Sequence, residues 1–352
     1  MKAILSALLL SFFLSATSWA ESPDQDFDAL VQKRGLKPAT CLLFVDAASI
    51  EARTQKWRAL IQDWWTQNPE HLTAWIIGAA KPPQSVVEES TNQKDCMLVS
   101  LIVAAADPSN EMVVHWGDEN HDASAMPRIF DRFQTDTRFR RNLIDWITRS
   151  DYRDAREQSY IWHRKFVFRG NPFNRVSAHA AKKCELPEGR TWNPAMSSHR
   201  TCWFETLSTE EREVEILGAS AAPGISRHHW GTDFDLFSLN PRNFVDGARM
   251  NDEYQWLAKH GVHWGYSQAY IGGHQDHGYM EERWHWSYVP IAAALQEHVR
   301  ANEAHFAAAL NAQWDSFESR WGSKHPEDRR FFNFIRENWR PFMFHVNQGF
   351  SK

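Results

Sequence analysis

An alternating aromatic segment in the C-terminal third of the chain constrains the fold more than any other feature. Large rings alternate there with smaller or polar side chains, as Trp284, Trp286 and Tyr288 against His285, Ser287 and Val289. Alternation with a period of two is typical of a β-strand, because successive side chains point to opposite faces. Glu282 stands in the loop just before this strand, where a bend would bring its carboxylate beside His285. The segment therefore predicts a strand that carries an imidazole, with a carboxylate close to it.

A second segment, 226–235, places an imidazole and a carboxylate around a glycine. His228 and Asp235 stand seven residues apart, so their side chains would point to opposite faces of an unbroken strand. Gly231 lies between them and favours a break in the backbone. With that break, both side chains can face a single ion. Asp233 shares the strand parity of Asp235 and is the alternative carboxylate ligand.

Together the two segments supply what metal-dependent hydrolysis requires. Such a site needs three protein ligands, an open coordination position for water, and a carboxylate that takes a proton from that water. His228, Asp235 and His285 provide the ligands, and Glu282 provides the carboxylate. Either segment alone is weak support, because an acidic residue near a histidine is common by chance. The combination supplies every group that a metallohydrolase requires.

The same residues resemble the signature of a known family. The pattern Ser-x-His-x-x-Gly-x-x-x-Asp runs from Ser226 to Asp235, and Glu-x-Trp-His runs from Glu282 to His285. A third element, Ser-x-Tyr-Arg followed by Gln, spans 150–158 in the expected order. Through these three ordered motifs, residues 120–290 resemble the VanY-type D-alanyl-D-alanine metallopeptidases of the M15 family.

The resemblance implies a fold and a set of residue roles. It implies an α+β fold of the LAS or hedgehog-like kind, with a central antiparallel sheet that carries the zinc ligands between flanking helices. Zn²⁺ would be held by His228, Asp235 and His285, with Glu282 as the general base. Arg153 would act near the scissile group, where its fork of donors suits an oxyanion or a terminal carboxylate. The other implied substrate contacts are Tyr152, Gln158 and Ser226.

The implied reaction is zinc-dependent hydrolysis of peptide bonds in peptidoglycan stem peptides by a D-alanyl-D-alanine carboxypeptidase. An endopeptidase with the same metal centre is an alternative, because the two activities differ in how the cleft ends. A non-catalytic protein that binds cell-wall peptides is an alternative from another class. Motifs for serine catalysis, Ser-x-x-Lys and Gly-x-Ser-x-Gly, are absent from the sequence, as is His-Glu-x-x-His.

Two departures from the family pattern bear on the site. Asp233 stands where the family usually has a small residue such as alanine, so its carboxylate would crowd or retune the metal. About 67 residues separate Gln158 from Ser226, which is longer than usual. Asp235 keeps the family's spacing from His228 and is retained as the ligand, while Asp233 either replaces it or supports it.

The first 20 residues read as a signal peptide. Lys2 precedes an apolar run from Ala3 to Leu14, and the small residues Ser18 and Ala20 suit cleavage after position 20. The run is shorter than the roughly 20 residues that span a membrane, and no later stretch is long and apolar enough to do so. We therefore expect a secreted protein, periplasmic and soluble, with no transmembrane segment.

The cysteines and the net charge limit the partners. In an exported chain, four cysteines favour disulfides, and the simplest pairing joins Cys41 to Cys96 and Cys184 to Cys202. The formal charge of −5 offers no basic field for the phosphates of nucleic acids. We expect a peptidoglycan peptide as the substrate and no nucleic-acid partner.

After the signal peptide, three regions follow along the chain. Residues 21–118 read as an N-terminal α/β accessory region, residues 119–290 as the zinc peptidase domain, and residues 291–352 as a C-terminal helical extension. The peptidase domain would open with a helix over 128–148, and a disulfide would bracket a long insertion loop over about 170–202.

Finer patterns predict the elements of the accessory region. Spacing typical of a helix covers 52–67, with Trp57, Leu60, Ile61 and Trp64 on one stripe. Short apolar runs resemble buried strands at 42–45, 75–77 and 97–104.

Overall fold

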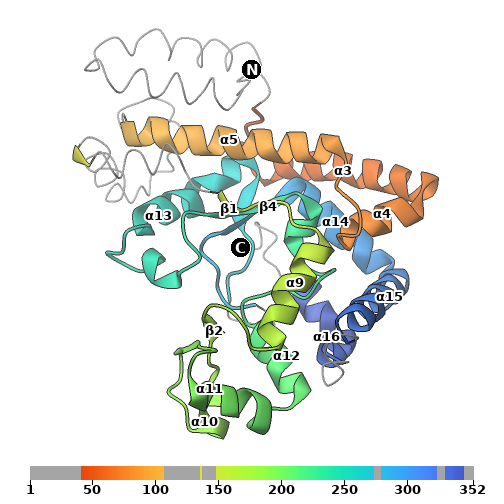
Figure 1. The fold of residues 1–352 in the computed structure, drawn as a ribbon. Coiled ribbons are helices and arrows are strands. Elements are labelled where there is room, and N and C mark those ends of the chain that lie inside the picture. Colours follow the sequence, from red (N-terminus) through yellow and green to blue (C-terminus); the bar gives the residue numbers. More distant parts are fainter. Residues whose placement is uncertain (1–40, 107–134, 137–147, 273–278, 323–329, 345–352) are drawn as a thin grey trace.

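The structure is a computed structural model that describes residues 41–106, 135–136, 148–272, 279–322 and 330–344. Helices surround a small central antiparallel sheet (Figure 1), so the expected α+β class is confirmed. The predicted signal peptide, the boundary near residue 118 and most of the helix over 128–148 lie outside the described residues. No helix among those described is long and apolar enough to cross a membrane.

The central sheet has four strands in the order β1-β4-β6-β5. All neighbours are antiparallel. The strands are β1 (Thr148–Ser150), β4 (Asp233–Leu236), β5 (Tyr266–Gln268) and β6 (His285–Tyr288). The predicted strand at the aromatic segment is β6, and its alternation separates two faces. One face carries Trp286 and Tyr288, and the other carries His285 and Ser287.

The N-terminal region forms three helices, of which α5 packs on the aromatic face of the sheet. They are α3 (Ala47–Gln67), α4 (Pro69–Ile76) and α5 (Gln84–Ala106). From β6 the Tyr288 hydroxyl donates to the Glu89 carboxylate of α5 at 2.8 Å. From β5 the Tyr266 hydroxyl donates to the Ser90 carbonyl at 2.6 Å. Helix α5 therefore closes the core on the side of the sheet that carries the rings.

Strands were expected at 42–45, 75–77 and 97–104, and this prediction is wrong. Residues 42–45 are irregular, while the other two runs lie within or at the end of helices α4 and α5. A short apolar run buries its side chains in a helix as well as in a strand, so periodicity alone does not separate the two. The predicted helix over 52–67 is confirmed as part of α3. It begins earlier, because Asp46 and Ser49 form a capping box.

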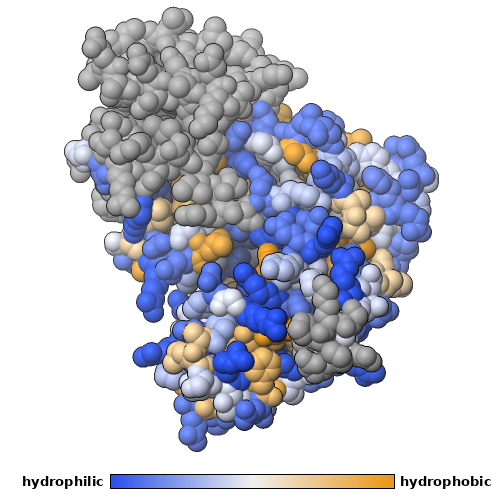
Figure 2. All heavy atoms as spheres, viewed as in Figure 1, coloured by the Kyte–Doolittle hydropathy of each residue, from blue (hydrophilic) through white to orange (hydrophobic). Residues whose placement is uncertain are grey.

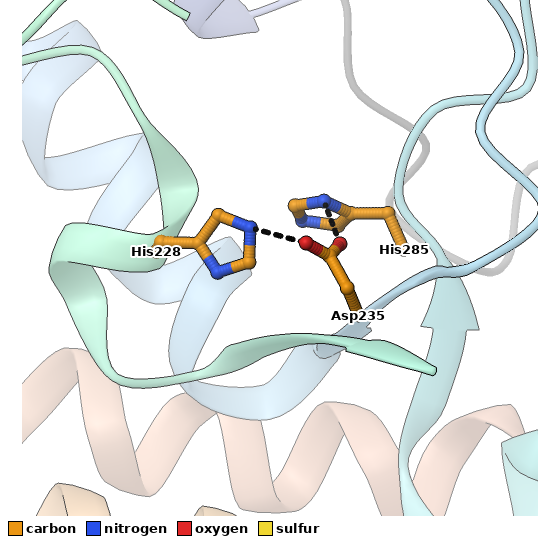
Figure 3. Close-up of side chains that lie close together, drawn as sticks. All are labelled: His228, Asp235 and His285. Carbon is orange, nitrogen blue, oxygen red and sulfur yellow. Dashed lines mark ion pairs between the residues drawn. The ribbon is translucent and has the colours of Figure 1, made fainter. Parts of the chain in front are cut away.

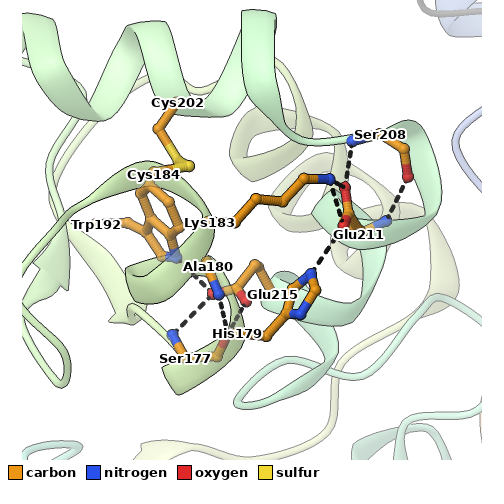
Figure 4. The surroundings of a disulfide bond; sticks show 10 residues. All are labelled: Ser177, His179, Ala180, Lys183, Cys184, Trp192, Cys202, Ser208, Glu211 and Glu215. Carbon is orange, nitrogen blue, oxygen red and sulfur yellow. Dashed lines mark hydrogen bonds and ion pairs between the residues drawn. A yellow bond between two sulfur atoms is a disulfide. The ribbon is translucent and has the colours of Figure 1, made fainter.

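Both predicted disulfides are present. Cys41–Cys96 fastens the chain before α3 to the middle of α5, and Cys184–Cys202 closes the insertion. The insertion was predicted as a loop, but it contains short elements that Figure 4 shows around the second disulfide. They are β2 (Phe173–Arg175), α10 (Ala178–Cys184), β3 (Thr191–Trp192), α11 (Ser197–Thr201) and the π-helix η2 (Cys202–Thr206).

A buried carboxylate ties this insertion to helix α12 (Thr209–Leu217). Glu215 accepts hydrogen bonds from the backbone N–H and hydroxyl of Ser177 and from Trp192 Nε1 (Figure 4). Three donors to one carboxylate explain why so short a unit holds its shape. Its surface in Figure 2 mixes polar and apolar areas. Met196 and Phe204 are among its exposed apolar side chains.

The C-terminal extension is helical, as predicted. Its helices are α14 (Val289–Ala301), α15 (Glu303–Gly322) and α16 (Asn333–Phe344). Helix α14 follows β6 directly and pairs with α3 through Arg58 and Glu297. Trp314 of α15 donates from Nε1 to the Pro223 carbonyl at 2.8 Å, in the loop that leads to His228. The remaining elements are α9 (Ala155–Phe166), α13 (Asn251–His260) and the 3-10 turns η3 (Arg227–Trp230), η4 (Pro241–Phe244) and η5 (Gly261–Trp264).

Glu213 on α12 is a buried acid at the start of α16. One oxygen, Oε2, accepts from the Ile335 backbone N–H at 3.2 Å, and the other, Oε1, has no hydrogen-bond partner. Burial raises the pKa of this carboxyl to about 8, against the lowering effect of the backbone N–H groups of α16. The folded protein therefore holds a proton on Glu213 at neutral pH.

Stability should fall as the pH rises, because Glu213 has a higher pKa folded than unfolded. Its contribution is complete below the unfolded value of 4.5 and is lost as the pH passes through about 8. The shift corresponds to about 5 kcal/mol at most. In Glu213→Gln, urea unfolding between pH 5 and 8 should depend less on pH than in the wild type. Glu188→Gln, at an exposed position, should keep the wild-type slope; equal slopes in all three proteins would contradict the assignment.

Candidate metal centre

The sharp turn that carries His228 is built around Gly231. Ser226 precedes the 3-10 turn η3, and Gly231 ends it with φ +74°, in the left-handed region. A Cβ atom on this glycine would also lie 2.9 Å from Cγ of Pro82. The chain then enters β4 at Asp233, so the predicted break between imidazole and carboxylate is present.

Register between β4 and β6 brings the other two side chains together. Asp235 is paired with His285, Phe234 with Trp286, and Asp233 with Ser287. Directly opposed residues of antiparallel strands point to the same face, so Asp235 and His285 are neighbours. Figure 3 shows the two imidazoles on either side of the Asp235 carboxylate.

The distances within this group suit a single ion. His228 Nε2 lies 3.3 Å from Asp235 Oδ2, and His285 Nδ1 lies 3.1 Å from Asp235 Oδ1 (Figure 3). One ligand atom from each residue falls within 4.8 Å of the other two, and all three side chains are buried. The structure thus brings together the three residues that the sequence proposes as ligands.

The second nitrogen of each imidazole has a partner that fixes the ring. His228 Nδ1 donates to the Asp151 carbonyl at 2.9 Å, because a carbonyl oxygen only accepts. His285 Nε2 lies 3.0 Å from Asp233 Oδ2 and donates to that carboxylate. In the neutral rings, the lone pairs of His228 Nε2 and His285 Nδ1 then face Asp235. Such outer hydrogen bonds are usual for metal-ligating histidines.

A buried oxygen of Asp235 tests whether a cation fits. Its Oδ1 accepts no hydrogen bond, although His285 Nδ1 lies 3.1 Å away. With the His285 proton on Nε2, a nitrogen lone pair would face a carboxylate oxygen, and only a positive charge between them relieves that repulsion. The nitrogen and oxygen donors suit zinc in number and kind.

Electrostatics of the group point the same way. Burial opposes the ionisation of Asp235, yet His228 and His285 hold the pKa of this carboxyl well below its usual range. Burial also disfavours a charged His285, but the nearby carboxylates of Asp233, Asp235 and Glu282 raise its pKa well above its usual value. The carboxylates around His285 therefore stabilise a positive charge at this ring, either an added proton or a bound metal ion.

Asp233 lies beside the site without joining the ligand group. Its Oδ1 accepts from Thr232 Oγ1 at 2.7 Å and from Ser287 Oγ at 2.8 Å. Its Oδ2 accepts from Arg227 Nε at 3.1 Å and from His285 Nε2 at 3.0 Å. Four donors fill the roughly four acceptor positions of a carboxylate. The acceptor positions of Asp233 are thus occupied, whereas the Asp235 carboxylate lies between the two imidazoles.

Glu282 lies at the edge of the same group. Its Oε2 is 3.5 Å from His285 Nδ1, and its backbone carbonyl accepts from the His285 N–H at 3.2 Å. The predicted bend before the strand is therefore present. Burial raises the pKa of Glu282, while the neighbouring His285 acts in the opposite direction. A carboxylate with a raised pKa is a stronger base.

Arg153 and Gln158 form a pair next to the turn of His228. The Arg153 backbone N–H donates to the His228 carbonyl at 3.2 Å, and its Nη1 donates to Gln158 Oε1 at 2.6 Å. Gln158 is buried and donates from Nε2 to the Ala221 carbonyl at 2.6 Å. Tyr152 lines an open cavity of about 500 Å³. None of the three candidate ligands, His228, Asp235 and His285, lines that cavity.

His229 has a structural place behind the site. Its Nδ1 donates to the Arg153 carbonyl at 2.6 Å, and its Nε2 accepts from the Gly224 N–H at 3.0 Å. Burial lowers the pKa of His229 to about 3, so the ring is neutral. It joins the Arg153 segment to the loop before Ser226, whose side chain is buried at the start of η3.

Lys165 was not singled out from the sequence. Part of its side chain reaches the surface, yet desolvation of the ammonium group lowers its pKa to about 7, while Glu282 acts in the opposite direction. Its Nζ donates to Asn174 Oδ1 at 2.8 Å. In the sequence it reads as one of several basic residues in the last turn of α9, where cations are common, so no signal sets it apart.

Two imidazoles, one carboxylate ligand and an adjacent free carboxylate define the mononuclear metallohydrolase class of site. Residues 125–291 match the family model described as VanY, D-alanyl-D-alanine carboxypeptidase. This matched segment contains the three motifs from which the sequence predicts a VanY-type M15 metallopeptidase.

Individual relatives are more distant. A protein of Haemophilus influenzae, described as uncharacterized, is 28% identical over 78 residues, which cover 19% of this chain and 60% of that protein. The chain therefore spans about 60% of the length of the curated relative it matches.

Solved structures with similarity include a zinc complex of a point mutant of the vancomycin-resistance D,D-pentapeptidase VanY. That structure is 22% identical, with 50% of this chain and 79% of that chain covered and a TM-score of 0.25. VanYB in complex with D-alanine-D-alanine is 21% identical, with 51% and 82% covered and a TM-score of 0.25. The LD-carboxypeptidase LdcB is 16% identical, with 54% and 76% covered and a TM-score of 0.23.

Purified protein should bind one zinc ion per chain, and Asp235→Ala should weaken that binding by on the order of 100-fold or more. The reason is that, among the described residues, only the Asp235 carboxylate has oxygens that face both imidazoles. Competition with a chromophoric chelator measures the dissociation constant. His179→Gln removes an exposed histidine and should bind zinc like the wild type. Unchanged zinc affinity in Asp235→Ala would refute the ligand set.

Proposed function

We propose that this protein is a zinc-dependent peptidase that hydrolyses peptide bonds in peptidoglycan stem peptides as a D-alanyl-D-alanine carboxypeptidase. One observation carries the proposal: the buried His228, Asp235 and His285 group, with Glu282 at its edge, lies inside a VanY-family segment. A bound zinc ion would supply Lewis acidity toward water and toward the carbonyl of the scissile bond.

Glu282 is the proton carrier in this proposal. Its buried Oε2 takes a proton from the attacking water and returns it to the nitrogen of the leaving amine. The raised pKa of Glu282 favours the first of these transfers, because a more basic carboxylate removes a proton more readily. The aromatic face behind the sheet keeps bulk water away from that side.

Arg153 is the candidate for recognition of the terminal carboxylate. Gln158 holds one of its nitrogens, and Gln158 is itself held by the Ala221 carbonyl, so the guanidinium is oriented in advance. A planar fork of donors binds a carboxylate through two hydrogen bonds. This contact would favour a substrate that ends at the residue released, which distinguishes a carboxypeptidase from an endopeptidase.

We also propose that the protein works outside the cytoplasm, in the periplasm. The pattern of the first 20 residues supports export, and two disulfides suit an oxidising compartment. The proposed substrate, a peptidoglycan stem peptide, also lies outside the cytoplasm.

Glu282→Gln should lower kcat on a pentapeptide that ends in D-alanyl-D-alanine by roughly 1,000-fold or more, because an amide takes no proton from water. Zinc content should remain at one ion per chain. Glu281→Gln is the matched control, since this neighbouring carboxylate is exposed. Released D-alanine, quantified by mass spectrometry, is the readout. Activity retained in Glu282→Gln would exclude the assigned base.

The same assay separates the alternatives. Release of free D-alanine from stem peptides supports carboxypeptidase action, and cleavage within cross-links alone would show an endopeptidase. A wild-type protein that binds stem peptides and cleaves neither substrate would be the non-catalytic binding protein.

Arg153→Met should lower kcat/KM on the free-acid pentapeptide by roughly 100-fold, because a charge-assisted contact with the terminal carboxylate is lost. On the same peptide with an amidated C-terminus, the variant and the wild type should differ by less than about threefold. Arg156→Met, in the first turn of α9, serves as the control. An equal loss of kcat/KM on both peptides would show that Arg153 does not bind the terminal carboxylate of the substrate.

A further inference from the structure

The surroundings of Asp233 are those of a built and fully occupied carboxylate site. The side chain is buried, and four residues donate to it. Arg227 lies on η3, Thr232 lies between η3 and β4, and His285 and Ser287 lie on β6. A carboxylate in such a place costs free energy to bury unless every acceptor position is used. Here each oxygen receives two donors, so the carboxylate is held in one orientation.

One of those donors is a ligand of the candidate metal centre. His285 Nε2 donates to Asp233 Oδ2 at 3.0 Å, which leaves Nδ1 as the nitrogen that faces Asp235 and Glu282. An ionised carboxylate only accepts hydrogen bonds, so it selects the tautomer with the proton on Nε2. In that tautomer the lone pair is on Nδ1, where the ion would be held.

Arg227 balances the added charge. Both side chains are almost fully buried, and Arg227 also donates to Ser287 Oγ and packs its guanidinium over the Trp230 ring. The signature that this chain resembles has a small residue at the position of Asp233. The aspartate and the buried arginine together add no net charge beside the metal ligands.

We propose that Asp233 is a positioning residue that fixes the ring of His285 with Nδ1 toward the metal, and that Arg227 and Ser287 hold Asp233 in place. The inference rests on the proposed metal centre but not on the reaction that it performs. In this proposal Asp233 does not replace Asp235 as a metal ligand. It supports the site by accepting a hydrogen bond from Nε2 of His285, on the opposite side of the ring from the metal.

Zinc affinity tests the proposal independently of peptidase activity. In Asp233→Ala the dissociation constant of zinc, measured by chelator competition, should rise by roughly 10- to 100-fold, as for other outer partners of ligating histidines. The double variant Arg227→Met/Asp233→Ala removes both buried charges, so it avoids an unpaired arginine and should show the same rise. Arg227→Met alone keeps the acceptor for His285 but removes a donor that holds it, so its dissociation constant for zinc should lie between those of the wild type and Asp233→Ala.

A matched control separates positioning from packing. Thr232→Val removes a donor to the same carboxylate without touching His285, and it should leave zinc affinity within about threefold. Zinc binding by the double variant as tight as in the wild type would overturn the proposal. Failure of both Asp233 variants to fold without metal would make Asp233 a packing residue and overturn it as well. A wild-type protein that binds zinc but hydrolyses no peptide would refute the proposed function alone.

Discussion

The pairing of β4 with β6 is the interaction on which the rest of the structure depends. It places Asp235 opposite His285 and Asp233 opposite Ser287, although the two strands lie about 50 residues apart in sequence. A slip of one residue would turn the acidic side chains of β4 to the aromatic face and dissolve the site. The register is fixed because each face has its own chemistry: rings pack against α5 on one side, and hydrogen-bonded polar groups meet on the other.

The regions outside the family match serve this arrangement. Helix α5 completes the core behind the sheet and is fastened by the Cys41–Cys96 disulfide. On the other flank, α15 fixes the loop before His228 through the bond from Trp314 to Pro223. His229 ties that loop to Arg153. The ligands therefore sit on backbone that is held from several directions, as a metal site with fixed geometry requires.

Sequence reasoning reached the site because its signals are local. The alternation around His285, the glycine break after His228 and the spacing to Asp235 each depend on a few adjacent residues, and the structure contains all of them. The C-terminal helices and both disulfides were also anticipated. The accessory region was misjudged because short apolar runs such as 97–104 fit a buried helix equally well.

Other features depend on contacts between segments that are distant in sequence, so no local sequence pattern predicts them. Asp233 acquires its role only when β6 brings His285 and Ser287 to it and η3 brings Arg227. Lys165 is set apart only by desolvation and by the charge of Glu282, which lies more than 100 residues further along the chain. The order within the insertion likewise depends on Glu215, which belongs to the following helix.

Anomalous diffraction at the zinc edge, from crystals of the metal-loaded protein, tests the central claim most directly. The account predicts one peak, within about 2.0–2.2 Å of His228 Nε2, His285 Nδ1 and an oxygen of Asp235, with Asp233 bonded to the opposite nitrogen of His285. A peak on the Asp233 carboxylate, on the Nε2 side of His285, or away from these residues altogether would contradict it.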